Sequence, residues 1–160
     1  MSKRTLLVLR TLLILAIAAI LTFIYYHSTR VGNSSAYFSQ AATSKINQIL
    51  SFLHMDGVFS EGAVRKMAHF GEYWLLGFLT CALFLTFPKM HTFWSICLPL
   101  VGGISAAGLD EWIQRYTPGR NGQVMDVILD GFGVCLGIFV ALFFFFLVTN
   151  AKNQDFHKRI

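Results

Sequence analysis

The sequence predicts an all-α integral membrane protein: a four-helix bundle with a short extracytoplasmic amphipathic helix between spans one and two. The chain has 160 residues, of which 55% are hydrophobic and 13% are charged, whereas a soluble domain has about 25% charged residues. Its apolar runs are about 20 residues long, which matches a hydrocarbon core about 30 Å thick. Its ionisable residues gather near one end of three of these runs. We expect one domain over residues 1–160.

The four spans are expected at about residues 5–26, 64–87, 92–115 and 123–149. The first follows Lys3, Arg4 and Arg10. A cleaved signal peptide is the competing interpretation, because a basic start before an apolar run is typical of both. We favour an uncleaved span, because the run continues to Tyr25 and Tyr26 without a clear cleavage site and such aromatic residues mark a membrane interface.

The connections between the spans differ in character. Residues 27–62 are mostly polar and open with an expected loop at residues 32–35. Apolar residues then recur at helical spacing at Phe38, Ala42, Ile46, Ile49 and Leu53. They predict an amphipathic helix, capped near Ser35, on the membrane or over the other helices, where it could be a packing lid without chemistry. Between spans three and four, Pro118-Gly119 and Asn121-Gly122 are turn dipeptides that predict a tight antiparallel hairpin.

The positions of Lys and Arg predict a multi-pass protein of the cell membrane with both termini in the cytoplasm. One side carries Lys3, Arg4, Arg10, Lys89, Lys152, Lys158 and Arg159, and the other carries Arg30, Lys45, Arg65, Lys66, Arg115 and Arg120. Arg65, Lys66, Arg115 and Arg120 are left out of this comparison of the two sides, because they belong to a polar cluster in which acidic partners are expected.

The polar cluster combines residues from the last three spans. Its members are Arg65, Lys66, His69, Glu72, Asp110, Glu111, Gln114, Arg115, Arg120, Asp126 and Asp130. Because successive spans run in opposite directions, all of them should lie in one layer near the outer interface. Gly133 and Gly137 continue the helical stripe of Asp126 and Asp130, and small residues at this spacing allow close helix contact. The acidic stripe should therefore face the neighbouring helices.

Two explanations of this layer are open. The charges nearly balance, so they could be ion pairs that only set the helix packing. We favour a hydrated pocket that opens outward, because ionisable residues inside a membrane are costly.

The same residues resemble the signature of the VanZ-like family. The resemblance rests on residues 65–73 (RKMAHFGEY), on residues 110–114 (DEWIQ), and on Pro118-Gly119-Arg120 followed by Asp126, Asp130 and Gly133. It spans roughly residues 64–146. The family is named for a protein that confers resistance to the lipoglycopeptide teicoplanin in Gram-positive bacteria. The resemblance therefore implies a small membrane protein of the cell envelope, with a link to antibiotic resistance.

Three functions remain open at this point. The first is binding or modification of a lipid-linked or lipoglycopeptide ligand. The expected ligand-binding residues are Arg65, Lys66, Asp110, Gln114, Arg115 and Arg120, and the expected acids, bases and proton shuttle are His69, Glu72, Glu111, Asp126 and Asp130. The second is a membrane-embedded hydrolase or transferase acting on a cell-wall or phospholipid precursor. The third is transport, which we disfavour because residues 75–87 and 136–146 carry no charge.

The expected partners are the lipid bilayer and this ligand, and nucleic acid is not expected. His69, Glu72, Asp126 and Asp130 would suit a divalent cation. No paired-His motif is present, however, so neither a metal nor a cofactor is predicted. The sequence leaves open the oligomeric state and whether the protein is an enzyme.

Overall fold

The fold is a bundle of long helices, and no strand occurs in the described part of the chain. The computed structural model describes residues 2–30, 32–53 and 59–157. The helices are α1 (Lys3–Ser28), α2 (Gly32–Phe52), α3 (Glu61–Leu85), α4 (Thr92–Tyr116) and α5 (Val124–His157). Four stretches are long and apolar enough to cross a membrane, namely α1, α3, α4 and Val124–Ala151 of α5. The predicted all-α fold with four spans is confirmed.

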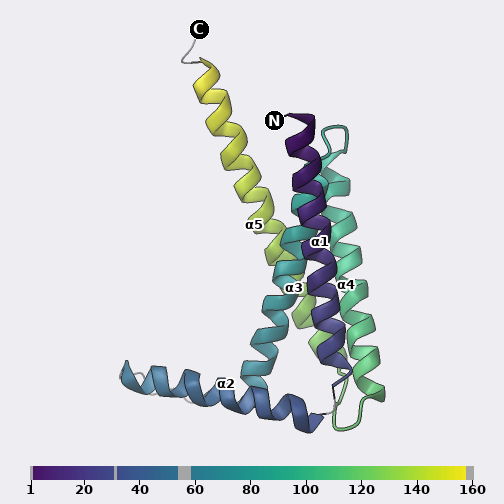
Figure 1. Ribbon diagram of the computed structural model, residues 1–160, viewed down its shortest axis with the longest axis vertical. Coiled ribbons are helices and arrows are strands. Elements are labelled where there is room, and N and C mark those ends of the chain that lie inside the picture. The colour runs from purple at the N-terminus through teal and green to yellow at the C-terminus, as the bar shows by residue number, and fades with distance from the viewer. Residues whose placement is uncertain (1, 31, 54–58, 158–160) are drawn as a thin grey trace.

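The spans alternate in direction, so their polar segments meet at one end of the molecule. The ends of α1 and α4 lie beside the starts of α3 and α5 (Figure 1). We call this end the polar end. The start of α1 and the end of α5 lie at the opposite end, and α2 lies across the spans at the polar end (Figure 1).

Helix α3 is central, because it contacts α1, α2, α4 and α5. The predicted hairpin of α4 and α5 is present, but α5 packs more extensively on α3 than on α4.

The α3–α5 contact depends on glycines. A Cβ atom on Gly133 would lie 2.6 Å from the carbonyl oxygen of Phe70, and one on Gly137 would overlap the carbonyl oxygen of Trp74. Gly77 of α3 lies against the backbone of Val134 in the same way. Since small residues let helix backbones approach closely, the predicted stripe of Gly133 and Gly137 does face a neighbouring helix.

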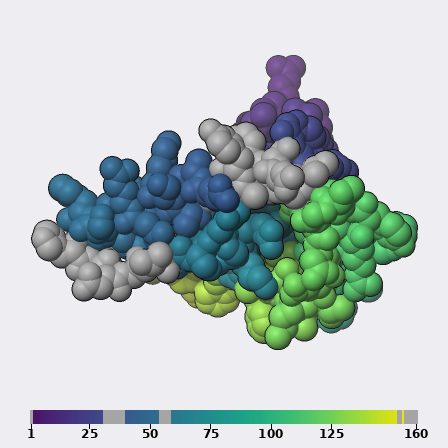
Figure 2. Space-filling view, turned by 90° about the horizontal axis from the view of Figure 1, so that it is seen from below, coloured from purple at the N-terminus to yellow at the C-terminus, as the bar shows by residue number. Residues whose placement is uncertain are grey.

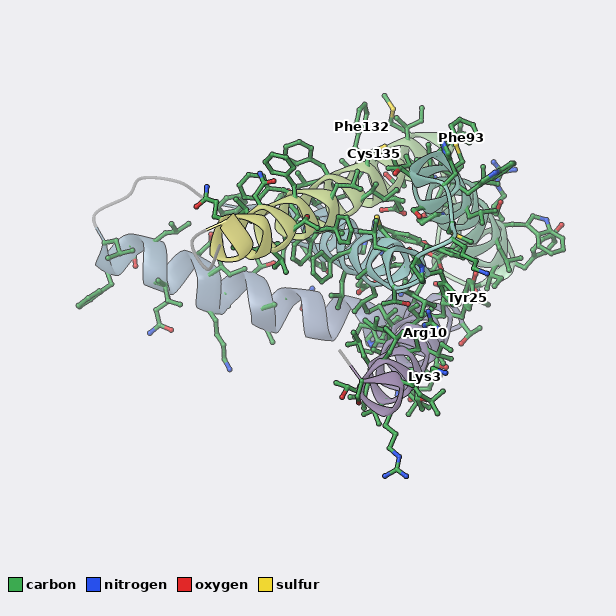
Figure 3. All side chains as sticks on the ribbon, turned by 90° about the horizontal axis from the view of Figure 1, so that it is seen from above. Lys3, Arg10, Tyr25, Phe93, Phe132 and Cys135 are labelled. Carbon is green, nitrogen blue, oxygen red and sulfur yellow. The ribbon has the colours of Figure 1, made fainter. Side chains whose placement is uncertain are left out.

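Large apolar side chains cover much of the outer surface. Phe132, for example, is 64% exposed, and Figure 3 shows it with Cys135 on the side of α5 away from α1. Such a surface fits a lipid environment, in which apolar side chains need no protein cover. The cysteines Cys81, Cys97 and Cys135 are free thiols.

Helix α2 is longer than predicted. It begins at Gly32, so the loop expected at residues 32–35 is wrong. Ser and Asn are favoured at helix starts as well as in turns, which explains the error. The side chains of Ser35 and Phe38 lie outside the described residues. The far end of α2 extends beyond the bundle (Figure 1). Ile49 in this helix and Leu53 just after it are exposed, as in a helix that lies on a membrane surface.

The connection between α2 and α3 is held by a side chain. The Asn47 amide accepts a hydrogen bond from the N–H of Phe59 at 2.9 Å and donates one to the Phe59 carbonyl at 3.2 Å. Ser60 then caps α3 by accepting a hydrogen bond from the N–H of Ala63 at 3.2 Å. Helix α5 continues to His157, beyond the expected end at residue 149, because no Gly or Pro interrupts residues 150–157.

At the end opposite the polar end, Arg10 joins α1 to the end of α3. Its Nε donates to Thr86 Oγ1 at 2.9 Å, and its Nη2 donates to the Thr86 carbonyl oxygen at 2.7 Å. The guanidinium also lies 3.9 Å from the centre of the Phe87 ring. The last carbonyl groups of a helix lack partners within the helix, so Arg10 satisfies one of them.

We expect Arg10→Ala to lower the free energy of unfolding by about 1.5–3 kcal/mol, the usual range for hydrogen bonds to a charged group. Arg4→Ala is the matched control, because Arg4 is exposed on the same helix. Thermal unfolding in detergent measures both. An equal loss in the two variants would show that the charge matters and the contacts with Thr86 do not.

Candidate functional site

The polar end brings together side chains from α3, α4 and α5, as well as from the end of α1. The most buried of them is Asp110, which is 0% exposed. Its Oδ1 accepts a hydrogen bond from the hydroxyl of Ser28, and its Oδ2 accepts one from Gln114 Nε2 at 3.1 Å. These two donors fix the carboxylate between α1 and α4.

His69 lies between two carboxylates. Its Nδ1 is 3.7 Å from Glu72 Oε2 and 3.8 Å from Asp110 Oδ2. Both separations are too long for a hydrogen bond. The imidazole is largely buried, with 15% of its side chain exposed. The residue expected as proton shuttle therefore lies beside Glu72, an expected acid or base, and beside Asp110, an expected ligand-binding residue.

Two further polar groups are buried without a hydrogen-bond partner in the part of the chain that the structure describes. They are the Asp130 carboxylate, through both of its oxygens, and the Tyr73 hydroxyl. Asp130 is 1% exposed and Tyr73 is 0% exposed. Such groups are costly in a protein interior, so each needs a physical explanation.

Glu111 positions the start of α5. Its Oε2 accepts a hydrogen bond at 2.8 Å from the N–H of Gln123, the residue before the helix. Glu111 is also buried, at 5% exposed. This contact gives Glu111 a positioning role in addition to the acid or base role that the sequence predicts.

Replacing Glu111 tests the positioning role. We expect Glu111→Leu to lower the free energy of unfolding by about 1–3 kcal/mol, because the Gln123 N–H loses its acceptor. Glu111→Gln keeps an acceptor oxygen and should lose less than half of that amount. Thermal unfolding in detergent measures both changes, and equal losses would rule out the hydrogen bond as the cause.

The loop between α4 and α5 carries Arg120. The N–H of Arg120 donates to the Thr117 carbonyl at 3.1 Å, and Gly119 has φ 75°, as a type II turn with Pro at its second position requires. Arg120 Nη2 donates to the His27 carbonyl at 2.9 Å. Burial, followed by the positive charge of Arg65, lowers the pKa of Arg120 from its ordinary value.

The other cations differ in their contacts. Lys66 Nζ lies 2.5 Å from Asp126 Oδ1. The side chain of Arg115 packs against Gly122 in the loop and is exposed. Neither Arg65 nor Arg115 has an ion pair with a described acidic residue, so the acidic partners expected for these two are wrong.

Lys158 and Arg159, which contribute to the predicted orientation, lie outside the described residues. The orientation in the membrane therefore stays a prediction.

Two hollows open among these residues. The larger one, which we call the basic cavity, has a volume of about 210 Å³ and lies between α1, α2 and α3. It is lined by Phe23, His27, Arg30, Ala42, Val64, Arg65, Ala68, His69, Glu72 and Arg120. Figure 2 shows this end from below, with α2 on one side of α3 and the α4–α5 loop on the other.

The second hollow, which we call the small hollow, has a volume of about 10 Å³. It is lined by Arg65, Lys66, His69, Glu111, Gln114, Asp126, Leu129 and Asp130. His69 and Arg65 line both hollows. Arg115, which the sequence grouped with the ligand-binding residues, lines neither of them.

The sequence analysis missed the contribution of α1. Ser28 binds Asp110, and His27 and Arg30 line the basic cavity. The sequence did contain an indication of this contribution: His27, Ser28 and Arg30 follow closely after the aromatic pair Tyr25 and Tyr26, at the end of the first apolar run.

The fold and the buried cluster define a class: a small helical membrane protein with an ionisable site at one end of its spans. The family model for VanZ/LLP1 matches residues 12–146. The chain therefore belongs to the VanZ/LLP1 family, and the match includes most of α1, which the resemblance over residues 64–146 left out. A comparison with curated proteins and with solved structures gave no match.

Proposed function

We propose that this VanZ-like membrane protein binds the anionic headgroup of a lipid-linked molecule or lipoglycopeptide in the basic cavity. The observation that carries the proposal is the lining of that cavity. Arg30, Arg65 and Arg120 line it, and Glu72 is the one carboxylate among its lining residues. A guanidinium can bind phosphate or carboxylate through two parallel hydrogen bonds. The excess of positive charge thus favours an anionic ligand.

The walls of the cavity suit a ligand with an apolar part. Phe23, Val64 and Ala68 supply apolar surface beside the guanidinium groups. The cavity lies at the polar end of the spans, where α2 lies across them (Figure 1). If the four long apolar helices span the bilayer, this end would lie at the depth at which headgroups meet hydrocarbon. A lipid-anchored ligand would present its charged group at that depth.

The wider role that we propose is in the cell envelope of Gram-positive bacteria. With both termini in the cytoplasm, the basic cavity would open on the outer face. Teicoplanin carries a lipid tail and cell-wall precursors carry lipid and phosphate, so either would fit a cavity of this chemistry. The VanZ-like resemblance supports a link to resistance against such an antibiotic.

A second candidate function is a membrane-embedded hydrolase or transferase that acts on a cell-wall or phospholipid precursor. One observation favours it. His69 and Glu72 line the same cavity as the arginines, with Nδ1 and Oε2 3.7 Å apart. An imidazole and a carboxylate beside a bound ester are the groups that general acid–base catalysis requires.

The test uses the purified protein in detergent with a polyprenyl phosphate or teicoplanin as the probe and the uncharged polyprenol as the control. Binding of one phosphate-bearing probe should raise the melting temperature by roughly 5 °C at saturating concentration, whereas the polyprenol should have little effect. Native mass spectrometry gives the stoichiometry. Release of inorganic phosphate or another product would favour the enzyme, and no shift with either charged probe would contradict the binding proposal.

A further inference from the structure

His69, Asp110 and Asp130 come from three different helices and meet beneath the basic cavity. One possible ligand atom of each residue lies within 4.8 Å of the others. His69 Nδ1 and Asp110 Oδ2 are already 3.8 Å apart. Ligands bound at about 2.0–2.2 Å to one ion lie up to roughly 4.4 Å from each other. Side-chain shifts of less than about 1 Å would therefore bring all three into contact with a common ion.

The Asp130 carboxylate forms no hydrogen bond or ion pair with a described residue, although Arg65 lines the small hollow beside it. Asp110 receives hydrogen bonds from Ser28 and Gln114, but neither Asp130 oxygen has a hydrogen-bond partner among the described residues. Lys66, a cation on the same side, is paired with Asp126. An unpaired carboxylate is costly in a protein interior and more so within a membrane span. A divalent cation would neutralise both carboxylates at once.

Space and supporting contacts are also present. The small hollow is lined by two of the three residues, His69 and Asp130, as well as by the cations Arg65 and Lys66. Its volume of about 10 Å³ is close to that of a single water-sized probe, and Asp110 lies beside His69 rather than in its lining. Gln114 and Ser28 hold the Asp110 carboxylate in place, as residues behind a metal ligand commonly do. Of the two carboxylates, the one without a hydrogen-bond partner among the described residues, Asp130, thus lines a space of ionic size.

The geometry points to a binding site for one divalent transition-metal cation formed by His69, Asp110 and Asp130. One imidazole and two carboxylates suit Zn²⁺ or Mn²⁺ better than Mg²⁺ or Ca²⁺, which prefer oxygen ligands alone. This set differs from the His69, Glu72, Asp126 and Asp130 set considered from the sequence, because Lys66 binds Asp126 and Asp110 approaches His69. The site does not depend on the proposed ligand of the basic cavity.

The test is a metal titration of the purified, chelator-treated protein in detergent. Equilibrium dialysis against Zn²⁺ and against Mn²⁺, read by elemental analysis, should give one ion per chain for at least one of the two metals. Bound metal should also raise the melting temperature. Asp130→Asn should weaken the affinity at least tenfold, whereas Glu61→Gln, which removes an acid at the start of α3 that lines neither hollow, should alter it by less than about threefold. His69→Gln is the second ligand variant, in case Asp130→Asn does not yield folded protein.

Three results would overturn the site. The first is the absence of stoichiometric binding of either metal. The second is an equal loss of affinity in Glu61→Gln and Asp130→Asn, which would show that the overall negative charge of this end attracts the metal and that no specific site binds it. The third concerns stability. If Asp130→Asn melted at a higher temperature than the metal-saturated parent, Asp130 would be only a buried acid that destabilises the fold and binds no ion.

Discussion

Arg65→Ala is expected to weaken the binding of a polyprenyl phosphate by about tenfold to a hundredfold. Arg65 lines the basic cavity and is exposed, and it has no ion pair with a described acidic residue. Its removal should therefore leave the fold intact. A hydrogen bond to a charged group contributes about 1.5–3 kcal/mol, and each 1.4 kcal/mol corresponds to about tenfold in affinity. Titration of the fluorescently labelled phosphate against the protein in nanodiscs measures the change.

Arg115→Ala is the matched control for this prediction. It removes the same charge from the same end of the molecule, but Arg115 lines neither hollow and packs against Gly122. Its affinity for the phosphate should stay within about twofold of the parent's, since an exposed charge outside the cavity contributes little. Equal weakening in both variants would mean that net positive charge attracts the probe and that the cavity does not bind it.

Gly137→Ala is expected to destabilise the bundle by about 2–3 kcal/mol or to prevent its assembly, in the upper range for overpacking. A Cβ atom at this position would overlap the carbonyl oxygen of Trp74 and would also crowd the amide nitrogen of Phe78. Both atoms belong to the backbone of α3, which cannot move aside as a flexible side chain can. Thermal unfolding in detergent, followed by circular dichroism, measures the loss.

Gly131→Ala on the same helix is the control. The nearest atom to a Cβ atom there is Ile104 Cγ1 at 3.8 Å, an ordinary contact distance. Alanine favours a helix by up to about 1 kcal/mol over glycine, so this variant should be as stable as the parent or more so. If Gly137→Ala matched it in stability, close approach of α3 and α5 would not be what holds the bundle together.

The spans and their main contact could be predicted from the sequence because they follow from simple physical patterns. An apolar run of sufficient length specifies a span whatever its neighbours are. Gly133 and Gly137, four residues apart on the acidic stripe, marked the face that approaches another helix. The pattern could not say which helix that is, and α5 packs mainly on α3 although α4 is its neighbour in the chain.

The sequence predicted the level along the spans at which the site residues lie, but it did not predict which side chains contact each other across helices. Antiparallel spans bring residues near the ends of successive runs to one level, so His69, Asp110 and Asp130 were expected together. One partner of Asp110 is Gln114, four residues later on the same helix, but the other is Ser28, which is 82 residues away in the sequence, and no local pattern connects Ser28 with Asp110. Arg115 is exposed while Gln114 is buried, because adjacent residues on a helix point about 100° apart; a ligand-binding role for Arg115 stays a prediction. Helix α4 has glycine and alanine on several sides, so its buried face could not be identified.

The end of α1 has consequences for biogenesis. Ser28 donates to Asp110, its carbonyl accepts from Thr117 Oγ1 at 3.0 Å, and the His27 carbonyl accepts from Arg120 at 2.9 Å. All three partners are synthesised long after α1 leaves the ribosome. A nascent chain halted after its second span would therefore lack these three contacts at the end of α1. Quality-control proteases could recognise such a chain, and only insertion of the final hairpin would remove the signal.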